Sequence, residues 1–227
     1  MSRQNHYRTV FRMRWIVLLC CLICPLFLAA QQHQFGIQLS YQYRLLATKL
    51  RSEAVDPTLT ARGGLGFGLG SNYLGRLSRR FALNAEVSLL FDQEKFRSGR
   101  FTAVQPDIDI VELQVPVDLF YTFSLAKDWR PFVGLGLSYG YHLTNGSDFA
   151  GFYPKHQLGG RVTLGVEKVF RQFTCAPRLV YQQILNEQLR PDNWLTTGNF
   201  AYLHVQRVQL TLAFYGPQRK RVILPAD

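Results

Sequence analysis

The sequence predicts an all-β protein, an eight-stranded antiparallel up-and-down transmembrane β-barrel. Three observations support this prediction: eight segments alternate apolar and polar residues, the gaps between them alternate long and short, and the aromatic residues gather near the ends of the segments. In a barrel that crosses a membrane, one rim carries brief turns and the other carries longer loops. A sheet in solution has no reason to sort its turns in this way.

Each predicted strand has two chemically different faces. In the first segment Phe35, Ile37 and Leu39 lie on one face and Gln38 and Ser40 on the other, because successive side chains of a strand point to opposite faces. The segments are long enough for tilted strands to cross the hydrocarbon layer, which takes about 9–11 residues. We place the strands at residues 35–45, 63–73, 81–91, 109–123, 131–141, 157–168, 173–183 and 203–215.

The polar faces of these strands carry four acids and four bases, a balance that a narrow lumen requires because an unpaired buried charge is costly. The alternative is a soluble barrel with its polar face in water. Its interior would then have to hold every apolar face, although eight strands enclose little more than one layer of side chains. The predicted lumen charge network consists of Arg44, Glu86, Glu112, Asp118, His142, Arg161, Glu167, Arg178 and Arg207.

Aromatic residues fall into two groups at opposite ends of the predicted strands, with aliphatic residues between them. Such paired belts are typical of outer-membrane barrels, where aromatic rings lie at the two membrane interfaces. The group at the short-turn rim comprises Phe35, Tyr73, Phe81, Tyr121, Phe123, Trp129, Phe170, Phe173, Phe214 and Tyr215. The group at the long-loop rim comprises Tyr41, Tyr43, Phe91, Tyr139, Tyr141, Tyr181 and Tyr202.

Residues 1–30 have the composition of a secretory signal peptide. Four arginines and no acid precede a continuous apolar stretch of 16 residues from Trp15 to Ala30. A spanning helix needs about 20 residues, which argues against an uncleaved anchor. The bulky residues before Cys21 and Cys24 argue against a lipidated cysteine. We expect cleavage near Ala30, a barrel over residues 31–215 and a basic periplasmic tail over residues 216–227.

Charge and cysteine content agree with export to the outer membrane. Removing the signal peptide lowers the Lys and Arg count from 26 to 22 against 15 acids, so the net charge falls from +11 to +7. In an exported protein this charge favours anionic outer-membrane lipids and lipopolysaccharide as partners, not nucleic acid. Cys175 alone remains after cleavage, so no intrachain disulfide can form. Separately, we expect the barrel to be a monomer.

Glycines recur at every second position of residues 64–70, and Gly134, Gly136 and Gly140 share the polar face of the fifth strand in the same way. A phosphate-binding loop would need a strand–loop–helix context that this pattern does not provide. Glycine instead makes room for neighbouring side chains. If a turn near Arg76 sets the register, Glu86 lies opposite Gly68 and reaches a base such as Arg44.

A carboxylate–imidazole pair is the strongest candidate for catalytic chemistry. Mirroring the fourth and fifth strands across their turn places Glu112 opposite His142. Ser138 lies four residues from His142, about 13 Å along a strand and beyond proton-transfer distance. We therefore interpret the pair as structural and expect no catalytic residue, no cofactor and, without ligand spacing, no metal. A lipid-modifying enzyme, a narrow channel and a soluble ligand-binding barrel remain alternatives.

The predicted long loops are the expected sites of any specific function, because loops on a rigid scaffold usually carry binding residues. They combine bases with large apolar side chains. Two interpretations stay open: these apolar residues form an exposed contact patch, or they fold over the barrel mouth. The candidate contact residues are Phe149, Phe152, Tyr153 and Trp194.

With its strands placed, the chain resembles the PorT-like outer-membrane β-barrel family of Gram-negative bacteria. The resembling stretches are Val111–Val117, Arg130–Tyr139, Gly159–Glu167 and Val208–Tyr215. The resemblance implies a barrel of OmpA/OmpX-like architecture without known enzyme activity, in a family whose founding member is tied to a protein-secretion and gliding apparatus. The basic tail after the last strand departs from the usual pattern. We expect a non-enzymatic scaffold, adhesion or accessory role in secretion or envelope assembly, with envelope or secretion-complex proteins as partners.

Overall fold

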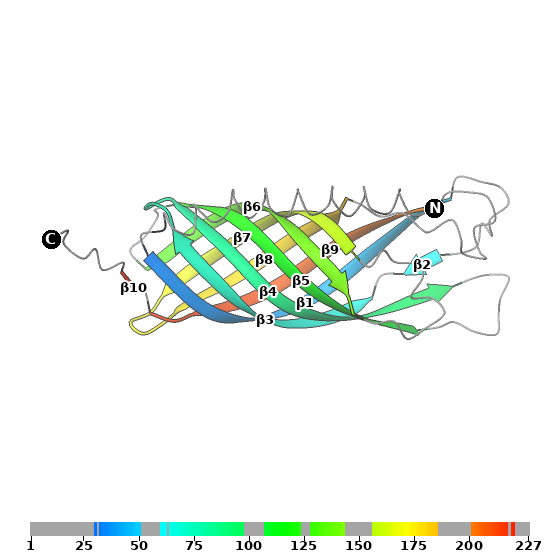
Figure 1. The fold of residues 1–227 in the computed structure, drawn as a ribbon, viewed down its shortest axis with the longest axis horizontal. Helices are drawn as coiled ribbons and strands as arrows, with labels where there is room; N and C mark the ends of the chain where they lie inside the picture. The colour runs from blue at the N-terminus through cyan, green and yellow to red at the C-terminus, as the bar shows by residue number, and fades with distance from the viewer. Residues whose placement is uncertain are drawn as a thin grey trace, which may run out of the picture.

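Eight long antiparallel strands close into a barrel in the computed structural model (Figure 1). The structure describes residues 30, 32–50, 60–62, 64–97, 107–123, 128–143, 156–185, 201–217 and 219–220. Among these residues, no helix combines the length and the apolar character that crossing a membrane requires. The predicted fold class is confirmed.

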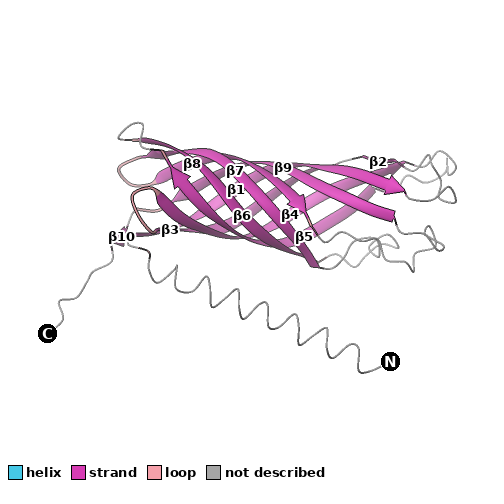
Figure 2. Ribbon diagram, turned by 90° about the horizontal axis from the view of Figure 1, so that it is seen from above, coloured by secondary structure: helices cyan, strands magenta, loops and turns pink. Residues whose placement is uncertain are grey.

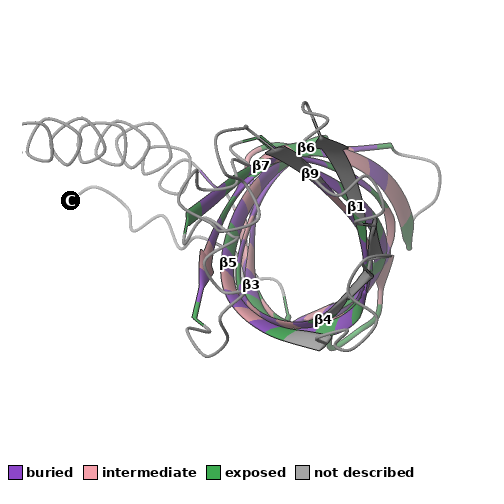
Figure 3. Ribbon diagram, turned by 90° about the vertical axis from the view of Figure 1, so that its right-hand side faces the viewer, coloured by how far each residue is buried: buried purple, intermediate pink, exposed green. Residues whose placement is uncertain are grey.

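The long strands pair in chain order, and the first pairs with the last to close the barrel, which Figure 3 shows as a ring. Two short strands add to this barrel: β2 (Thr60–Arg62) pairs with β4, and β10 (Arg219–Lys220) pairs with β1. The long strands are β1 (Gln32–Leu50), β3 (Leu65–Arg76), β4 (Phe81–Arg97), β5 (Asp107–Thr122), β6 (Trp129–His142), β7 (His156–Val169), β8 (Thr174–Ile184) and β9 (Ala201–Tyr215).

The two rims of the barrel differ as the spacing predicts. Short connections after β3, β5 and β7 lie at one end, on the left in Figure 2 together with β10. The far ends of β1, β4 and β5 extend beyond β6, β7 and β8 at the other end. The predicted signal peptide, apart from Ala30, lies outside the described residues and stays a prediction.

The predicted register of β3 and β4 is wrong. Arg76 pairs with Ala82, so Glu86 lies opposite Asn72 instead of Gly68. The turn lies further along the chain than expected because the Ser78 Oγ accepts hydrogen bonds from the backbone N–H groups of residues 80 and 81, at 3.2 and 3.0 Å. This hydroxyl fixes the chain reversal between β3 and β4.

The outer face of the barrel is apolar and the inner face is polar. Leu135 is 65% exposed and Leu210 62% exposed, whereas Arg44 and Arg207 are 0% exposed. In water this arrangement would expose apolar surface and bury charge, the reverse of a soluble protein. A hydrocarbon surround makes it favourable, because aliphatic side chains then face lipid.

Aromatic side chains of the outer face mark both rims, as predicted. At the short-turn rim, Phe35, Phe81 and Trp129 are exposed. At the long-loop rim, Tyr41 and Tyr139 are exposed. One prediction is wrong: Tyr215 is not part of the outer belt but is 1% exposed inside the lumen, because the pleat of β9 places Phe214 outside and the next residue inside.

Leu137→Arg tests the lipid-facing assignment, because Leu137 lies on the outer face near the middle of β6. We expect a loss of unfolding free energy of about 2–4 kcal/mol, the cost of a cation near the bilayer midplane. Leu143→Arg, just beyond the end of β6, is the matched control and should cost about 0–1 kcal/mol. Urea unfolding in phospholipid bilayers measures both, and equal costs would contradict the assignment.

Candidate functional site

The lumen of the barrel holds a buried network of charges, and this network is the candidate functional site. Five acids and five arginines of the described residues are buried there, so their formal charges balance. All nine residues of the predicted network are buried. The structure adds Asp92 and Arg76, which the sequence analysis missed because it ended the strands at residues 91 and 73.

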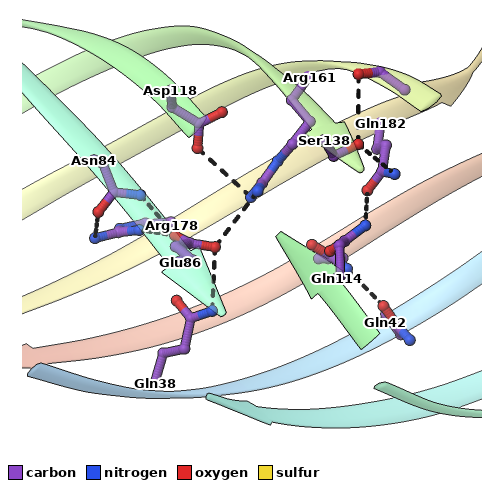
Figure 4. Close-up of polar contacts among 12 residues, drawn as sticks. Gln38, Gln42, Asn84, Glu86, Gln114, Asp118, Ser138, Arg161, Arg178 and Gln182 are labelled. Atoms are coloured by element: carbon purple, nitrogen blue, oxygen red, sulfur yellow. Dashed lines mark hydrogen bonds and ion pairs between the residues drawn. The ribbon is translucent and has the colours of Figure 1, made fainter. Parts of the chain in front are cut away.

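Glu86 on β4 is the centre of the cluster nearer the short turns (Figure 4). Its Oε1 atom accepts from the Nη1 of Arg178 at 2.6 Å and from the Nδ2 of Asn84 at 2.8 Å. Its Oε2 atom accepts from the Nε2 of Gln38 at 3.1 Å and from the Nη1 of Arg161 at 3.4 Å. Four partners from β1, β4, β7 and β8 thus meet at one carboxylate, which ties opposite walls of the barrel together.

Arg161 also joins Glu86 to a second acid. Its Nη2 lies 3.7 Å from the Oδ2 of Asp118, on the far side of β6. Gly136 is the register partner of both Asp118 and Arg161. A Cβ at Gly136 would collide with the Asp118 carboxylate, so the missing side chain is what lets the two charges approach across β6. This is the role that the sequence analysis predicted for the alternating glycines.

Arg178 stands over three aromatic rings that fill the lumen near the short turns. Its guanidinium carbon is 5.2 Å from the ring centroid of Phe120, 6.0 Å from that of Phe132 and 5.4 Å from that of Tyr215. Such stacking stabilises a cation away from water. These rings belong to a buried apolar cluster with Leu74, Ala82, Ala176 and Ala213. This plug was not predicted, although Phe120 and Phe132 occupy even-numbered positions on the polar faces of their strands, which is a signal for it.

A second ionic cluster lies nearer the long-loop rim. Arg207 Nη2 is 2.7 Å from the Oε2 of Glu112 and 3.5 Å from the Oδ2 of Asp92. Arg44 Nη1 is 3.9 Å from the same Asp92 oxygen. The expected contact between Glu86 and Arg44 is therefore wrong. With the shifted register, Glu86 pairs with bases of the cluster nearer the short turns, and Asp92 is the acid that lies beside Arg44.

The predicted pairing of Glu112 with His142 is present, with 3.5 Å between Oε2 and Nε2. The same carboxylate is held by Arg207, deep in the lumen where both acid and arginine are 0% exposed. A catalytic base would need access to substrate and a nucleophile nearby. The geometry of this pair is that of a structural contact. Among the described residues, no group of three His, Cys, Asp or Glu side chains has the arrangement of a metal site.

Neutral amides lie between the two ionic clusters. Gln114 Nε2 donates to Gln182 Oε1 at 2.8 Å, and Gln182 Nε2 donates to Ser138 Oγ at 2.9 Å (Figure 4). Gln209 Nε2 donates to Gln42 Oε1 at 2.6 Å, and Gln42 in turn donates to Asp92. At the end nearest the short turns, Arg76 pairs with Glu167. Hydrogen bonds and ion pairs therefore extend along the lumen.

The candidate loop residues Phe149, Phe152, Tyr153 and Trp194 lie outside the described residues. Their predicted contact role is untested by the structure. The described part of the loop-side rim ends at residues such as Leu50, Arg97 and Ala201 on its taller walls.

The fold, but not the sequence, is similar to known proteins. No protein-family model and no curated protein sequence matches the chain. The outer membrane protein OprG from Pseudomonas aeruginosa aligns with a TM-score of 0.55 and 14% identity over 84% of this chain and 97% of that one. Neisserial surface protein A aligns with a TM-score of 0.48 and 16% identity over 80% and 96%. The likeness to OprG shows the fold alone: a closed eight-stranded β-barrel.

Glu86→Ala tests the importance of the central carboxylate. Removing it leaves Arg178 and Arg161 buried with fewer partners, so we expect unfolding to become easier by about 3–5 kcal/mol. Asp109→Ala removes an exposed acid from β5 and should change the unfolding free energy by less than about 0.5 kcal/mol. Urea unfolding in bilayers measures both.

A double substitution checks that the effect comes from pairing. Glu86→Gln combined with Arg178→Gln should cost less than the sum of the two single changes, by about 0.5–3 kcal/mol. Strict additivity would show that the two side chains do not interact.

Proposed function

We propose that the chain is a non-enzymatic outer-membrane β-barrel whose lumen is closed and whose function is performed by its loops and rims. The single observation that carries this proposal is the filled, ion-paired lumen inside an apolar outer wall. The aromatic belts support a place in a membrane, since such belts mark its two interfaces. The predicted signal peptide and the fold shared with OprG favour the outer membrane of a Gram-negative cell.

A narrow channel is the first alternative, and the lumen argues against it. A conducting path would have to separate Arg178 from Glu86 and Arg207 from Glu112, and breaking a buried ion pair costs about 3–5 kcal/mol. It would also have to displace the aromatic plug of Phe120. These barriers act in series along the lumen, so opening one cluster leaves the other closed.

A lipid-modifying enzyme is the second alternative. Its site would have to lie on the outer wall, where acyl chains are, with a nucleophile beside a base. The described outer wall offers a histidine beside a tyrosine, with the hydroxyl of Tyr139 2.5 Å from the Nδ1 of His156. The His156 ring also packs against the rings of Tyr139 and Tyr141, with centroids 5.9 and 5.2 Å apart, so these contacts favour an interfacial aromatic cluster over a catalytic pair.

The remaining role is that of a scaffold, an adhesin or an accessory of secretion or envelope assembly. A rigid cylinder positions loops on one side of the membrane, and such loops are where binding residues concentrate. The PorT-like resemblance favours an accessory role in secretion, with envelope or secretion-complex proteins as partners. We propose a monomer, because the barrel satisfies its strand edges by closing on itself.

Planar-bilayer recording distinguishes a closed scaffold from a channel. We expect the purified, folded protein to give no stable conductance steps. Glu112→Ala combined with Arg207→Ala is the informative variant: it removes the loop-side cluster but should still not conduct, because the plug around Phe120 remains. Reproducible single-channel steps from the unaltered protein would contradict the closed lumen.

Photo-cross-linking in intact cells tests where the function resides. We expect a photoreactive residue at position 149 or 194 to capture envelope or partner proteins. The same residue at position 137, on the lipid-facing wall, is the matched control and should capture lipid alone. Absence of protein adducts at both loop positions and at the rims would argue against a scaffold or adhesion role.

A further inference from the structure

Three exposed arginines and one half-buried lysine gather at the short-turn rim of the barrel. Arg79 and Arg80 lie in the turn between β3 and β4, Arg171 lies in the turn between β7 and β8, and Lys168 lies near the end of β7. We call these four residues the basic collar. Outside the lumen, Asp128 is the one acid that the structure describes at this rim. The collar therefore presents a net positive surface.

Aromatic rings hold the collar at a defined depth. The Nζ of Lys168 is 4.6 Å from the centre of the Trp129 ring, a cation–π contact. The Nη1 of Arg80 donates to the hydroxyl of Tyr121 at 3.5 Å. Because tryptophan and tyrosine favour the membrane–water interface, the bases beside them lie at the level of lipid headgroups.

Arg171 lies in the turn between β7 and β8, where two aromatic rings stack on each other. Phe170 and Phe173 have ring centroids 4.6 Å apart, with an interplanar angle of 21°. Their backbones close the turn, since the N–H of Phe170 donates to the carbonyl of Phe173 at 2.8 Å. The turn presents Arg171 at its exposed tip. Aromatic rings thus lie beside Lys168 and Arg80 and flank Arg171 in the sequence.

The C-terminal tail returns two more basic positions to this rim. Strand β10 pairs with the start of β1, with Arg219 opposite His33 and Lys220 opposite Gln32. The pairing places the backbone of these two residues beside the short turns (Figure 2). These two positions thus add formal positive charge to the rim.

We propose that the basic collar binds the headgroups of anionic glycerophospholipids in the leaflet that faces the short turns. The inference rests on the proposed membrane location. A zwitterionic headgroup carries its own cation next to the phosphate, whereas an anionic headgroup leaves the phosphate charge available to Lys and Arg, so net anionic lipids are preferred. The collar selects phospholipid over lipopolysaccharide by position, because it lies at the rim opposite the long loops.

Quenching of Trp129 by brominated lipids measures this binding at the collar itself. Trp194→Phe leaves Trp129 as the single tryptophan of the chain once residues 1–30 are removed. The protein is folded in phosphatidylcholine bilayers that contain either dibromo-phosphatidylglycerol or dibromo-phosphatidylcholine. We expect phosphatidylglycerol to be preferred over phosphatidylcholine next to Trp129 by about fivefold at low salt. This ratio corresponds to the attraction of a single Lys or Arg to an anionic surface.

Two charge-matched variants locate the effect. Arg80→Gln, Lys168→Gln and Arg171→Gln together remove three of the four collar bases and should lower the preference strongly. Lys49→Gln, Arg62→Gln and Arg97→Gln remove the same charge from β1, β2 and β4 at the other rim and should leave the preference intact. Each variant is normalised to its own fluorescence in unbrominated lipid. No preference in the unaltered collar, or equal loss in both variants, would overturn the proposal.

Salt dependence gives a test that needs no collar variant. At 1 M salt the screening length is about 3 Å, so the preference of the Trp194→Phe protein should vanish, and a preference that persists would overturn an electrostatic collar. Failure of the proposed function can be distinguished from failure of the collar proposal. A chain that does not insert into bilayers of any composition would contradict the membrane barrel. Insertion without lipid selectivity would contradict the collar alone.

Discussion

Neutralisation of charge inside a closed cylinder is the constraint on which the rest of this structure depends. Five acids and five arginines are buried in a lumen too narrow for bulk water to surround them. An isolated buried charge is strongly unfavourable, and a pair is tolerated only with close geometry and further hydrogen bonds. The four partners of Glu86 supply both. Strand register, glycine placement and aromatic placement all serve this arrangement.

The closed lumen also explains where function can reside. Ion pairs cross-link this cylinder, and Phe120, Phe132 and Tyr215 pack across its lumen. Under the proposed function it therefore serves as a rigid support and not as a path for solutes. Its two rims then acquire separate roles. The loop side extends unevenly on β1, β4, β5 and β9, whereas the short-turn side carries a collar of bases held beside aromatic rings. The first arrangement suits partner binding, and the second suits a lipid surface.

Much of the fold could be predicted from two patterns in the sequence. The alternation of apolar and polar residues indicates the two faces of each strand, and the lengths of the gaps between strands indicate the two rims. The register of β3 against β4 could not be predicted from these patterns. A shift of one strand along the other by an even number of residues keeps every side chain on the same face of the sheet. The hydroxyl of Ser78 fixes that register, and it was a readable signal. Asp92 and Arg76 were missed at strand ends that the pattern leaves undefined. Tyr215 lies in the lumen because the pleat of β9, and not aromatic character, decides which face its side chain takes.

The most direct measurement of the central claim is the distance between the Glu86 carboxylate carbon and the Arg178 guanidinium nitrogens in lipid bilayers. Carbon–nitrogen dipolar recoupling by solid-state NMR on Glu- and Arg-labelled protein measures this distance. The Arg178→Lys variant identifies the part of the signal that comes from Arg178. A filled, ion-paired lumen predicts strong dephasing of the Glu86 signal, consistent with the 2.6 Å contact between Oε1 and Nη1. Absence of dephasing, together with rapid water exchange at both side chains, would contradict it.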